Sequence, residues 1–205
     1  AGEPVELVKC QTVDIEVPAT AEIVIEGLLS TEFCEREAPF GEFSGYMGAE
    51  EINPYFEVTC ITHRKNPIYT AFISQFPPSE SSKIRHVGYE AAYFKALQKD
   101  FSVPGILDVA FHESGGSAAY CVIKLKKYHP SHVWQALNGA AAYAASYPKI
   151  IIAVDADIDI HDPDSVNWAL SFRMQPHRDI KIYEGKTSIL DPSTAPQDWS
   201  GEERI

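Results

Sequence analysis

Three glutamates lie within a short stretch rich in glycine and aromatic residues, EREAPFGEFSGYMG at residues 35–48. Two of them, Glu37 and Glu42, are five positions apart across Pro39 and Gly41, a composition that favours a turn over a helix. A turn would let both carboxylates face one cavity. The walls of that cavity would come from the neighbouring aromatic residues, Phe40, Phe43 and Tyr46.

Carboxyl groups in such surroundings are suited to proton transfer. Desolvation destabilises the charged form of a carboxyl group among aromatic rings, so its pKa rises toward neutrality. The group then becomes a general acid that works near neutral pH, and a second carboxylate can tune or relay the proton. The alternative interpretation is a pair of ordinary solvated loop carboxylates, because acidic loops are common. The residue types alone leave both interpretations open.

The sequence around these glutamates resembles the UbiD family of reversible decarboxylases. The likeness consists of AEIVIEG at residues 21–27 followed by E-x-P-F-G-E at residues 37–42. It continues through PIYTAFISQFPPSESSKIR, VDADIDIHDPDSVNWALSFRMQPHRDI and SILDPS, and covers roughly residues 3–193. The E-x-P-F-G-E block is the most specific of these pieces.

This resemblance implies an enzyme that uses prenylated FMN, with divalent manganese and potassium, to remove CO2 from a carboxylic acid or to add it. The substrate would be a small aromatic or α,β-unsaturated acid. Glu37 matches the glutamate that pairs with arginine in the family's Glu-Arg-Glu network. Glu42 matches the acid/base that protonates the carbon after CO2 leaves.

The segment ESSKIRH lies beside the active site in the family's layout, so the resemblance also suggests residues of the substrate pocket. The candidates there are Ser81, Ser82, Arg85 and Val87, together with the aromatic residues Phe40, Phe43 and Tyr46. A helix cap followed by an exposed basic turn is an equally good interpretation of this segment.

Family members are usually more than twice as long as this sequence. Their N-terminal part carries the catalytic arginine, the metal ligands and most of the flavin pocket, and nothing in residues 1–30 matches it. The resemblance therefore predicts a C-terminal portion of such an enzyme, with cofactor-binding residues mostly elsewhere and no metal ligand of its own. The alternative is a non-catalytic fragment or subunit that forms oligomers, or one that depends on a partner subunit for the N-terminal half.

Composition narrows the possible partners and location. The chain has 205 residues, 45% of them hydrophobic, which suffices for one or two domains. A net charge of −12 argues against nucleic acid and anionic membranes as partners. No apolar run approaches the roughly 20 residues that span a bilayer, and the first 25 residues lack a signal-peptide layout. Four scattered cysteines indicate reduced thiols, and we expect a cytoplasmic protein.

The apolar pattern predicts a mixed fold of the α+β or α/β class. Alternation predicts strands in residues 4–30, 55–64 and 67–76, with residues 31–48 as a loop and Gly27 ending the strand before it. The predicted organisation is an antiparallel part of a split, cofactor-binding β-barrel at residues 1–78, a linker helix at 79–101, a compact C-terminal α/β oligomerisation domain at 102–190, and a polar tail at 191–205.

Within the C-terminal part, the order is a β-hairpin, a helix, a buried strand, a second helix and a last strand, DIKIYEG. The expected helix caps are Ser79, Ser81 or Ser82 for the linker helix, Ser131 for the next, and Asp164 or Ser165 for the last.

Two other motifs contain the residue types of a functional site but lack its full pattern. Asp155, Asp157 and Asp159 have the spacing of a calcium loop, but Ile160 stands where glycine is required. A strand that runs into a helix N-cap explains these acidic residues better. Ser114 beside His112 lacks the G-x-S-x-G context of a nucleophile and fits a hairpin turn.

Overall fold

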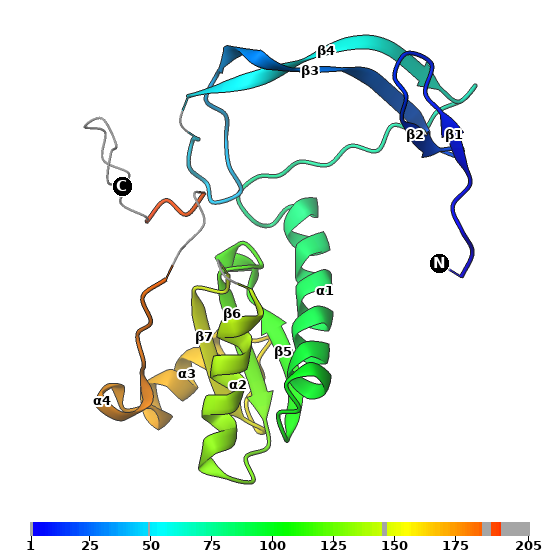
Figure 1. Cartoon of the computed structure of the whole chain (residues 1–205). Helices are drawn as coiled ribbons and strands as arrows, with labels where there is room; N and C mark the ends of the chain where they lie inside the picture. The colour runs from blue at the N-terminus through cyan, green and yellow to red at the C-terminus, as the bar shows by residue number, and fades with distance from the viewer. Residues whose placement is uncertain (1, 49, 145–146, 186–189, 194–205) are drawn as a thin grey trace. The chain divides into compact units, whose positions relative to one another are not determined.

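The computed structural model describes residues 2–48, 50–144, 147–185 and 190–193 (Figure 1). The chain forms two compact units. The first, here called the ribbon unit, consists of residues 1–40 and 47–72. The second, the layered unit, consists of residues 41–46 and 73–205. The mixed α and β fold predicted from the sequence is confirmed.

The ribbon unit is built from two antiparallel strand pairs. Strands β1 (Leu7–Lys9) and β2 (Glu16–Pro18) form a short hairpin, and β3 (Ile23–Glu37) pairs with β4 (Glu51–His63) along a much longer ribbon. The predicted strand end at Gly27 is wrong, because β3 continues through this residue at a β-bulge. A Cβ at this glycine would lie 2.2 Å from the carbonyl oxygen of Glu57, so only glycine fits there.

A buried carboxylate joins the two strand pairs of the ribbon unit. Glu26 on β3 accepts hydrogen bonds from the backbone N–H groups of Gln11 (2.9 Å) and Thr12 (2.7 Å), and from the Thr12 hydroxyl (2.8 Å). The hydrogen bond from the Gln11 N–H is the main cause that lowers the pKa of the Glu26 carboxyl, and the bonds from the Thr12 N–H and hydroxyl add to it. Desolvation acts in the opposite direction.

Two predicted strands are wrong. Residues 64–79 contain no strand, although 67–76 alternate well, and residues 179–185 contain none either. Both segments are largely exposed, with Ile182 the most exposed of their large apolar residues. Alternation shows that a segment can pair, but pairing needs a neighbouring strand, and the described part of the chain supplies none for either segment.

The layered unit begins with helix α1 (Glu80–Lys95), which continues as a π-helical turn, η1 (Ala96–Asp100). Of the three predicted caps, Ser79 is the residue that caps it. The Ser79 hydroxyl accepts the Ser82 N–H at 3.2 Å, and the Ser82 hydroxyl accepts the Ser79 N–H at 3.1 Å.

A three-stranded sheet in the order β5-β6-β7 forms the centre of the layered unit. Strands β5 (Ile106–Phe111) and β6 (Tyr120–Leu125) are antiparallel and joined through a short 3-10 turn, η2 (Glu113–Gly115). Strand β7 (Ile150–Asp155) runs parallel to β6. The predicted hairpin and the strand after it are confirmed.

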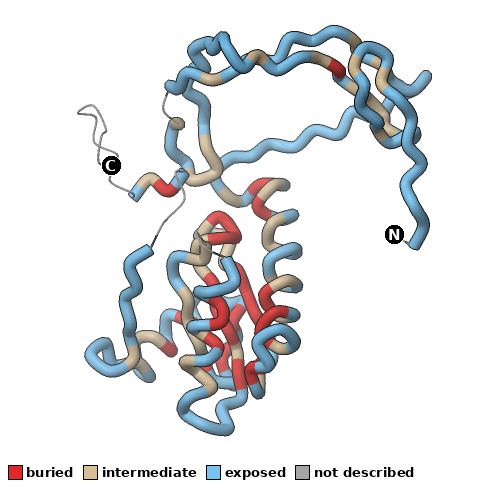
Figure 2. Tube along the Cα trace, in the orientation of Figure 1, coloured by how far each residue is buried: buried red, intermediate tan, exposed pale blue. Residues whose placement is uncertain are grey.

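Helices cover both faces of this sheet. Helix α1 and helix α2 (Pro130–Tyr143) pack on the face that presents Phe111 and Ile123, while α3 (Pro163–Arg173) packs on the face that presents Val122. Buried residues concentrate in these layers, whereas the ribbon unit is almost entirely exposed (Figure 2). A last short helix, α4, spans Pro176–Asp179.

The caps of α2 and α3 differ from the prediction by two or three positions. His129 caps α2 by accepting the Ser131 N–H on Nδ1 at 3.2 Å, and Asp162 caps α3 by accepting the N–H groups of Asp164 and Ser165. In both cases a proline occupies the first helical position, which places the cap on the residue immediately before it.

Side chains of the first helix and its π-helical turn meet backbone groups at the outer edge of β5. Glu90 accepts the Phe111 N–H at 3.0 Å, His86 Nδ1 lies 3.0 Å from the Phe111 carbonyl oxygen, and Gln98 donates to the Ile106 carbonyl oxygen at 3.0 Å. This edge of the sheet is therefore occupied by the chain itself.

Arg173 of α3 explains the acidic run after β7. It donates two hydrogen bonds to Asp157, at 2.8 and 2.6 Å, and lies 3.6 Å from Asp155. These bonds lower the pKa of the Asp157 carboxyl. Within the described ranges, no group of three or more His, Cys, Asp or Glu residues could hold a metal ion, and no helix is both long and apolar enough to cross a bilayer.

Candidate functional site

Glu37 is the last residue of β3 and belongs to the ribbon unit. It is exposed, lies opposite Glu51 in the β3–β4 ladder, and accepts a hydrogen bond from the Asn53 side-chain amide at 2.5 Å. The predicted loop is thus a strand up to this glutamate. A strand end gives the carboxylate a fixed backbone, and its exposure leaves it open to a cationic partner.

Glu42 lies on a tight turn of the layered unit, at residues 41–46. Its N–H donates to the Tyr46 carbonyl oxygen at 2.8 Å, and its own carbonyl oxygen accepts the Gly45 N–H at 3.0 Å. Gly45 has a φ of +88°, a conformation that side-chain-bearing residues rarely adopt. The sequence predicted a turn across Pro39 and Gly41, whereas the turn in the structure runs from Glu42 to Tyr46 and leaves Glu42 half-buried.

The two predicted catalytic carboxylates therefore belong to different units. Phe40, half-exposed, is part of the ribbon unit with Glu37, whereas Phe43 and Tyr46 are part of the layered unit with Glu42. The single cavity that these aromatic residues were expected to wall stays a prediction. No sequence pattern indicated that the chain would divide inside the motif.

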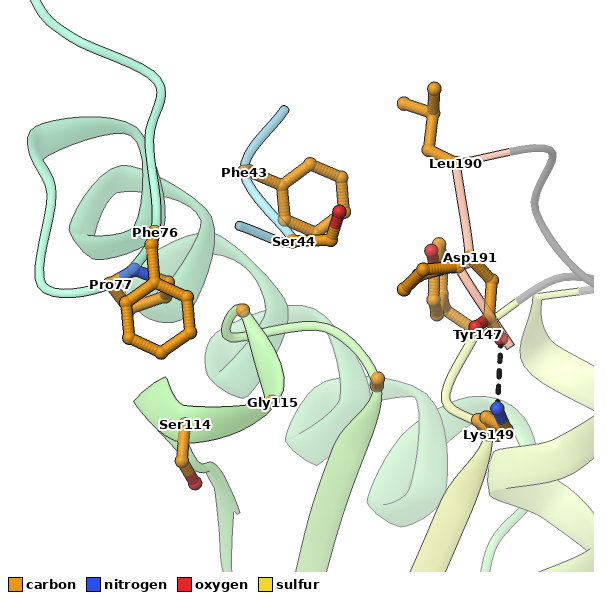
Figure 3. Close-up of a pocket in the computed structure, with 13 residues that line it drawn as sticks. Phe43, Ser44, Phe76, Pro77, Ser114, Gly115, Tyr147, Lys149, Leu190 and Asp191 are labelled. Atoms are coloured by element: carbon orange, nitrogen blue, oxygen red, sulfur yellow. Dashed lines mark hydrogen bonds and ion pairs between the residues drawn. The ribbon is translucent and has the colours of Figure 1, made fainter. Parts of the chain in front are cut away.

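A pocket of about 180 Å³ lies in the layered unit, next to the Glu42 turn (Figure 3). Phe43 and Ser44, which directly follow Glu42, form part of its wall. The other lining residues come from the segment before α1, the β5–β6 connection, the residues just before β7 and residues 190–192: Phe76, Pro77, Ser114, Gly115, Gly116, Ala119, Tyr147, Lys149, Leu190, Asp191 and Pro192.

One ion pair fixes a wall of this pocket. Lys149 Nζ lies 3.0 Å from Asp191 Oδ2 and also donates to the Ser193 hydroxyl, and Asp191 in turn accepts the Ser193 N–H at 3.0 Å. Figure 3 shows the Lys149 ammonium pointing at the Asp191 carboxylate. Sequence reasoning missed Phe76, Tyr147 and Lys149, because each belongs to a different segment and none has a motif of its own.

The remaining predicted pocket residues do not line this cavity. Ser82 is buried and bonded within the α1 cap, with a further contact to Glu113 at 3.3 Å. Arg85 donates to the Gly116 carbonyl oxygen at 3.1 Å and lies over the Phe43 ring, while Val87 is 68% exposed. Contact of these residues with a substrate stays a prediction.

The described residues fit part of a flat cofactor or substrate but not a whole flavin nucleotide. Ligand pockets in proteins usually measure about 300–1,000 Å³, and this one is smaller. Its aromatic and glycine walls suit a planar group, but the described residues offer no cluster of metal ligands that could hold a cofactor phosphate through a metal ion. Most of any such site would have to come from further residues.

The chain belongs to the UbiD family of carboxy-lyases. Residues 1–77 match the family model described as the 3-octaprenyl-4-hydroxybenzoate carboxy-lyase Rift-related domain. Residues 84–202 match the model of the 3-octaprenyl-4-hydroxybenzoate carboxy-lyase C-terminal domain. The recognition made from the E-x-P-F-G-E motif is thereby confirmed.

Solved structures of UbiD-class enzymes are similar to this chain over most of its length. HmfF from Pelotomaculum thermopropionicum, in complex with FMN, is 36% identical with a TM-score of 0.80, over 95% of this chain and 43% of that one. Vanillic acid decarboxylase from Sedimentibacter hydroxybenzoicus is 27% identical with a TM-score of 0.80, over 92% and 40%. The 3,4-dihydroxybenzoic acid decarboxylase of Klebsiella pneumoniae is 33% identical with a TM-score of 0.76, over 93% and 41%. The chain thus spans less than half the length of these relatives.

Proposed function

We propose that this chain is the C-terminal portion of a UbiD-class non-oxidative decarboxylase or carboxylase that acts on an aromatic or α,β-unsaturated carboxylic acid. Glu42 is the proton donor and acceptor, and Glu37 is the partner of the arginine in the Glu-Arg-Glu network. The observation that carries the proposal is the E-x-P-F-G-E block at residues 37–42, within a chain that matches both family models.

Decarboxylation leaves an electron pair on the carbon that loses CO2, and a proton must reach that carbon. In the proposed step the protonated Glu42 carboxyl gives up its proton, a C–H bond forms, and the carboxylate remains; carboxylation runs the same transfer in reverse. The backbone bonds of the 41–46 turn restrict where this carboxyl can go. Glu37, exposed at the end of β3, is available to hold and orient a guanidinium group.

The cofactor part of the proposal rests on relatives. HmfF has been solved with FMN and, in an evolved dimeric form, with prenylated FMN. We assign prenylated FMN to the complete enzyme on this support, and manganese and potassium on the family resemblance alone, with most of the binding residues outside the described part of this chain. The pocket beside Glu42 would contribute one apolar wall to that site.

The substrate class follows from the pocket and from the relatives together. Phe43, Phe76 and Tyr147 give the cavity aromatic walls, which suit a flat, conjugated acid. Two relatives decarboxylate vanillic acid and 3,4-dihydroxybenzoic acid. A cytoplasmic location and a homo-oligomeric state belong to the same proposal.

A second candidate function has support from the ribbon unit. Its large apolar side chains are exposed on a two-stranded ribbon, a form that is at best marginally stable alone. This favours a chain that is inactive by itself and requires an N-terminal half, either from the same polypeptide or from a partner subunit.

The test is turnover of the complete enzyme carrying Glu42→Gln. We expect the rate of CO2 release to fall by about 10²–10⁴-fold, the usual contribution of a general acid, while the fold is kept. Glu35→Gln is the matched control, since Glu35 lies on β3 two residues before Glu37 and should leave turnover unchanged. Full turnover in Glu42→Gln would overturn the assignment.

A further inference from the structure

We propose that Arg85 and Gly116 are positioning residues for Glu42, and that they act through the ring of Phe43. The inference deepens the proposed function, because it assigns to these two residues the task of holding the turn that carries the acid/base. Arg85 does not line the pocket beside the Glu42 turn, and Gly116, which has no side chain, lines it with backbone atoms alone. The proposed role is therefore to hold the turn and not to contact a substrate.

The turn at residues 41–46 needs an anchor. In the sequence it lies between β3 and β4, both in the ribbon unit, yet it packs as part of the layered unit. The chain therefore leaves one unit for six residues and returns to it. Such an excursion is held only if the six residues make contacts strong enough to offset the loss of conformational freedom.

The first anchor contact is between Phe43 and Arg85. The guanidinium carbon of Arg85 lies 4.5 Å from the centroid of the Phe43 ring, within the range of a cation–π interaction. Arg85 is itself held, because its NH1 group donates to the Gly116 carbonyl oxygen at 3.1 Å. Helix α1, the β5–β6 turn and the Glu42 turn thus meet at one side chain.

The second anchor contact is the approach of the Phe43 ring to bare backbone. A Cβ at Gly116 would lie 2.9 and 3.0 Å from two ring carbons of Phe43, and the shorter of these distances is one that real Cβ atoms essentially never show. Gly116 also has a φ of +64°, where a side chain is strained. The glycine therefore leaves the space that the ring occupies.

The position of Phe43 fixes that of Glu42, because the two residues are adjacent and the turn is short. The Glu42 N–H and carbonyl oxygen are both bonded inside the turn, to Tyr46 and Gly45. At the other end of the turn, the Phe76 ring packs against Gly45. A Cβ on this glycine would lie 2.9 Å from a ring carbon of Phe76. A displacement of the Phe43 ring is therefore carried to the carboxyl-bearing residue.

The experiment compares Arg85→Ala, Arg85→Lys and Gly116→Ala in the full chain by amide hydrogen exchange. We expect the amides of residues 42–46 to exchange about tenfold faster in Arg85→Ala and Gly116→Ala, while those of β6 keep their protection. Arg85→Lys keeps the charge but lacks the planar group, so its effect should be intermediate. This variant also serves if Arg85→Ala does not fold.

The matched control is Lys181→Ala. Lys181 Nζ lies 4.1 Å from the centroid of the Trp134 ring, so this variant removes a cation–π contact elsewhere in the layered unit. Its exchange at residues 42–46 should equal that of the unmodified chain. Unchanged exchange at 42–46 in both Arg85 variants, or an equal increase in Lys181→Ala, would overturn the inference.

Kinetics of the complete enzyme separate positioning from substrate contact. Misplacement of a catalytic group lowers kcat, so Arg85→Ala should lose about tenfold in kcat with KM within about twofold. A raised KM with unchanged kcat would instead make Arg85 a substrate contact and overturn the inference. If Glu42→Gln kept full turnover, the proposed function would fall, yet the exchange data would still decide whether Arg85 and Gly116 hold the turn.

Discussion

The ribbon unit and the layered unit contain similar apolar residues but bury them very differently. Phe111 in the layered unit is 1% exposed, whereas Phe33 on the ribbon is 65% exposed. The sheet of the layered unit has helices on both faces, all supplied by residues after position 79. Among the described residues of the ribbon unit, only the turn between β1 and β2 packs on the two long strands, where it buries Glu26, and most of their other residues stay exposed. The comparison shows that the chain supplies the packing partners of the layered unit's sheet but leaves most apolar residues of the ribbon uncovered.

Hydrogen exchange should show the largest difference between the units. Strand β6 lies between two other strands and within a packed core. We therefore expect its amides to be protected against exchange at least about a thousandfold more strongly than those of β3 and β4. Adding the N-terminal half of the enzyme should raise protection in β3 and β4 selectively. Equal protection of the two units in the isolated chain would break the comparison.

A pair of phenylalanine truncations tests the same contrast energetically. Phe111→Ala should lower the free energy of unfolding by about 3–5 kcal/mol, because it opens a cavity between α1, α2 and the sheet. Phe33→Ala, its control on the ribbon, should change that energy by less than about 0.5 kcal/mol. Both are measured by denaturant titration of the isolated chain, and a large effect of Phe33→Ala would mean that the ribbon is covered.

The start of α1 offers a smaller effect within the layered unit. Ser79→Ala removes one side of a reciprocal capping box, and we expect a loss of about 1 kcal/mol in the free energy of unfolding. Ser171→Ala is the control, since this serine is exposed on α3 and its hydroxyl donates to the Asn167 carbonyl oxygen within the same helix. An equal loss in both variants would assign the effect to helix propensity instead of the cap.

The smallest effect is a pH dependence confined to the ribbon unit. The pKa of Glu26 is lowered in the folded chain, so its carboxylate stabilises the 10–12 segment above the unfolded pKa. This stabilisation disappears as the pH falls through the lowered folded pKa. Exchange of the Gln11 and Thr12 amides, corrected for intrinsic rates, should therefore accelerate in acid. Glu26→Gln should abolish that dependence, and its persistence would point to another group.

The elements that the sequence predicted correctly are those with both a periodic pattern and a partner inside the chain. Strands β5, β6 and β7 and the three long helices satisfy this condition. Residues 67–76 and 179–185 have the pattern alone, and both predictions of a strand were wrong. The caps of α2 and α3 precede the predicted residues because proline occupies the first position of each helix.

The candidate site was predictable only to the extent that it is local in sequence. The E-x-P-F-G-E block identified the family and predicted Glu37 and Glu42 as candidate catalytic residues. The contact between Phe43 and Gly116 joins residues far apart along the chain, and from the sequence alone Gly116 was only part of a hairpin turn. Tertiary packing of this kind leaves no periodic signal, so no pattern could have connected these residues.

Because residues 41–46 belong to the layered unit, they affect the design of chimeras in which related enzymes exchange domains. The two family models meet between residues 77 and 84, which suggests that position as the natural junction for a chimera. A chimera joined there would take Phe43 from one parent, and Arg85 and Gly116 from the other. The residues that hold the Glu42 turn are therefore divided between the two family domains. Chimeras of parents that differ at these three positions should have lower activity than either parent.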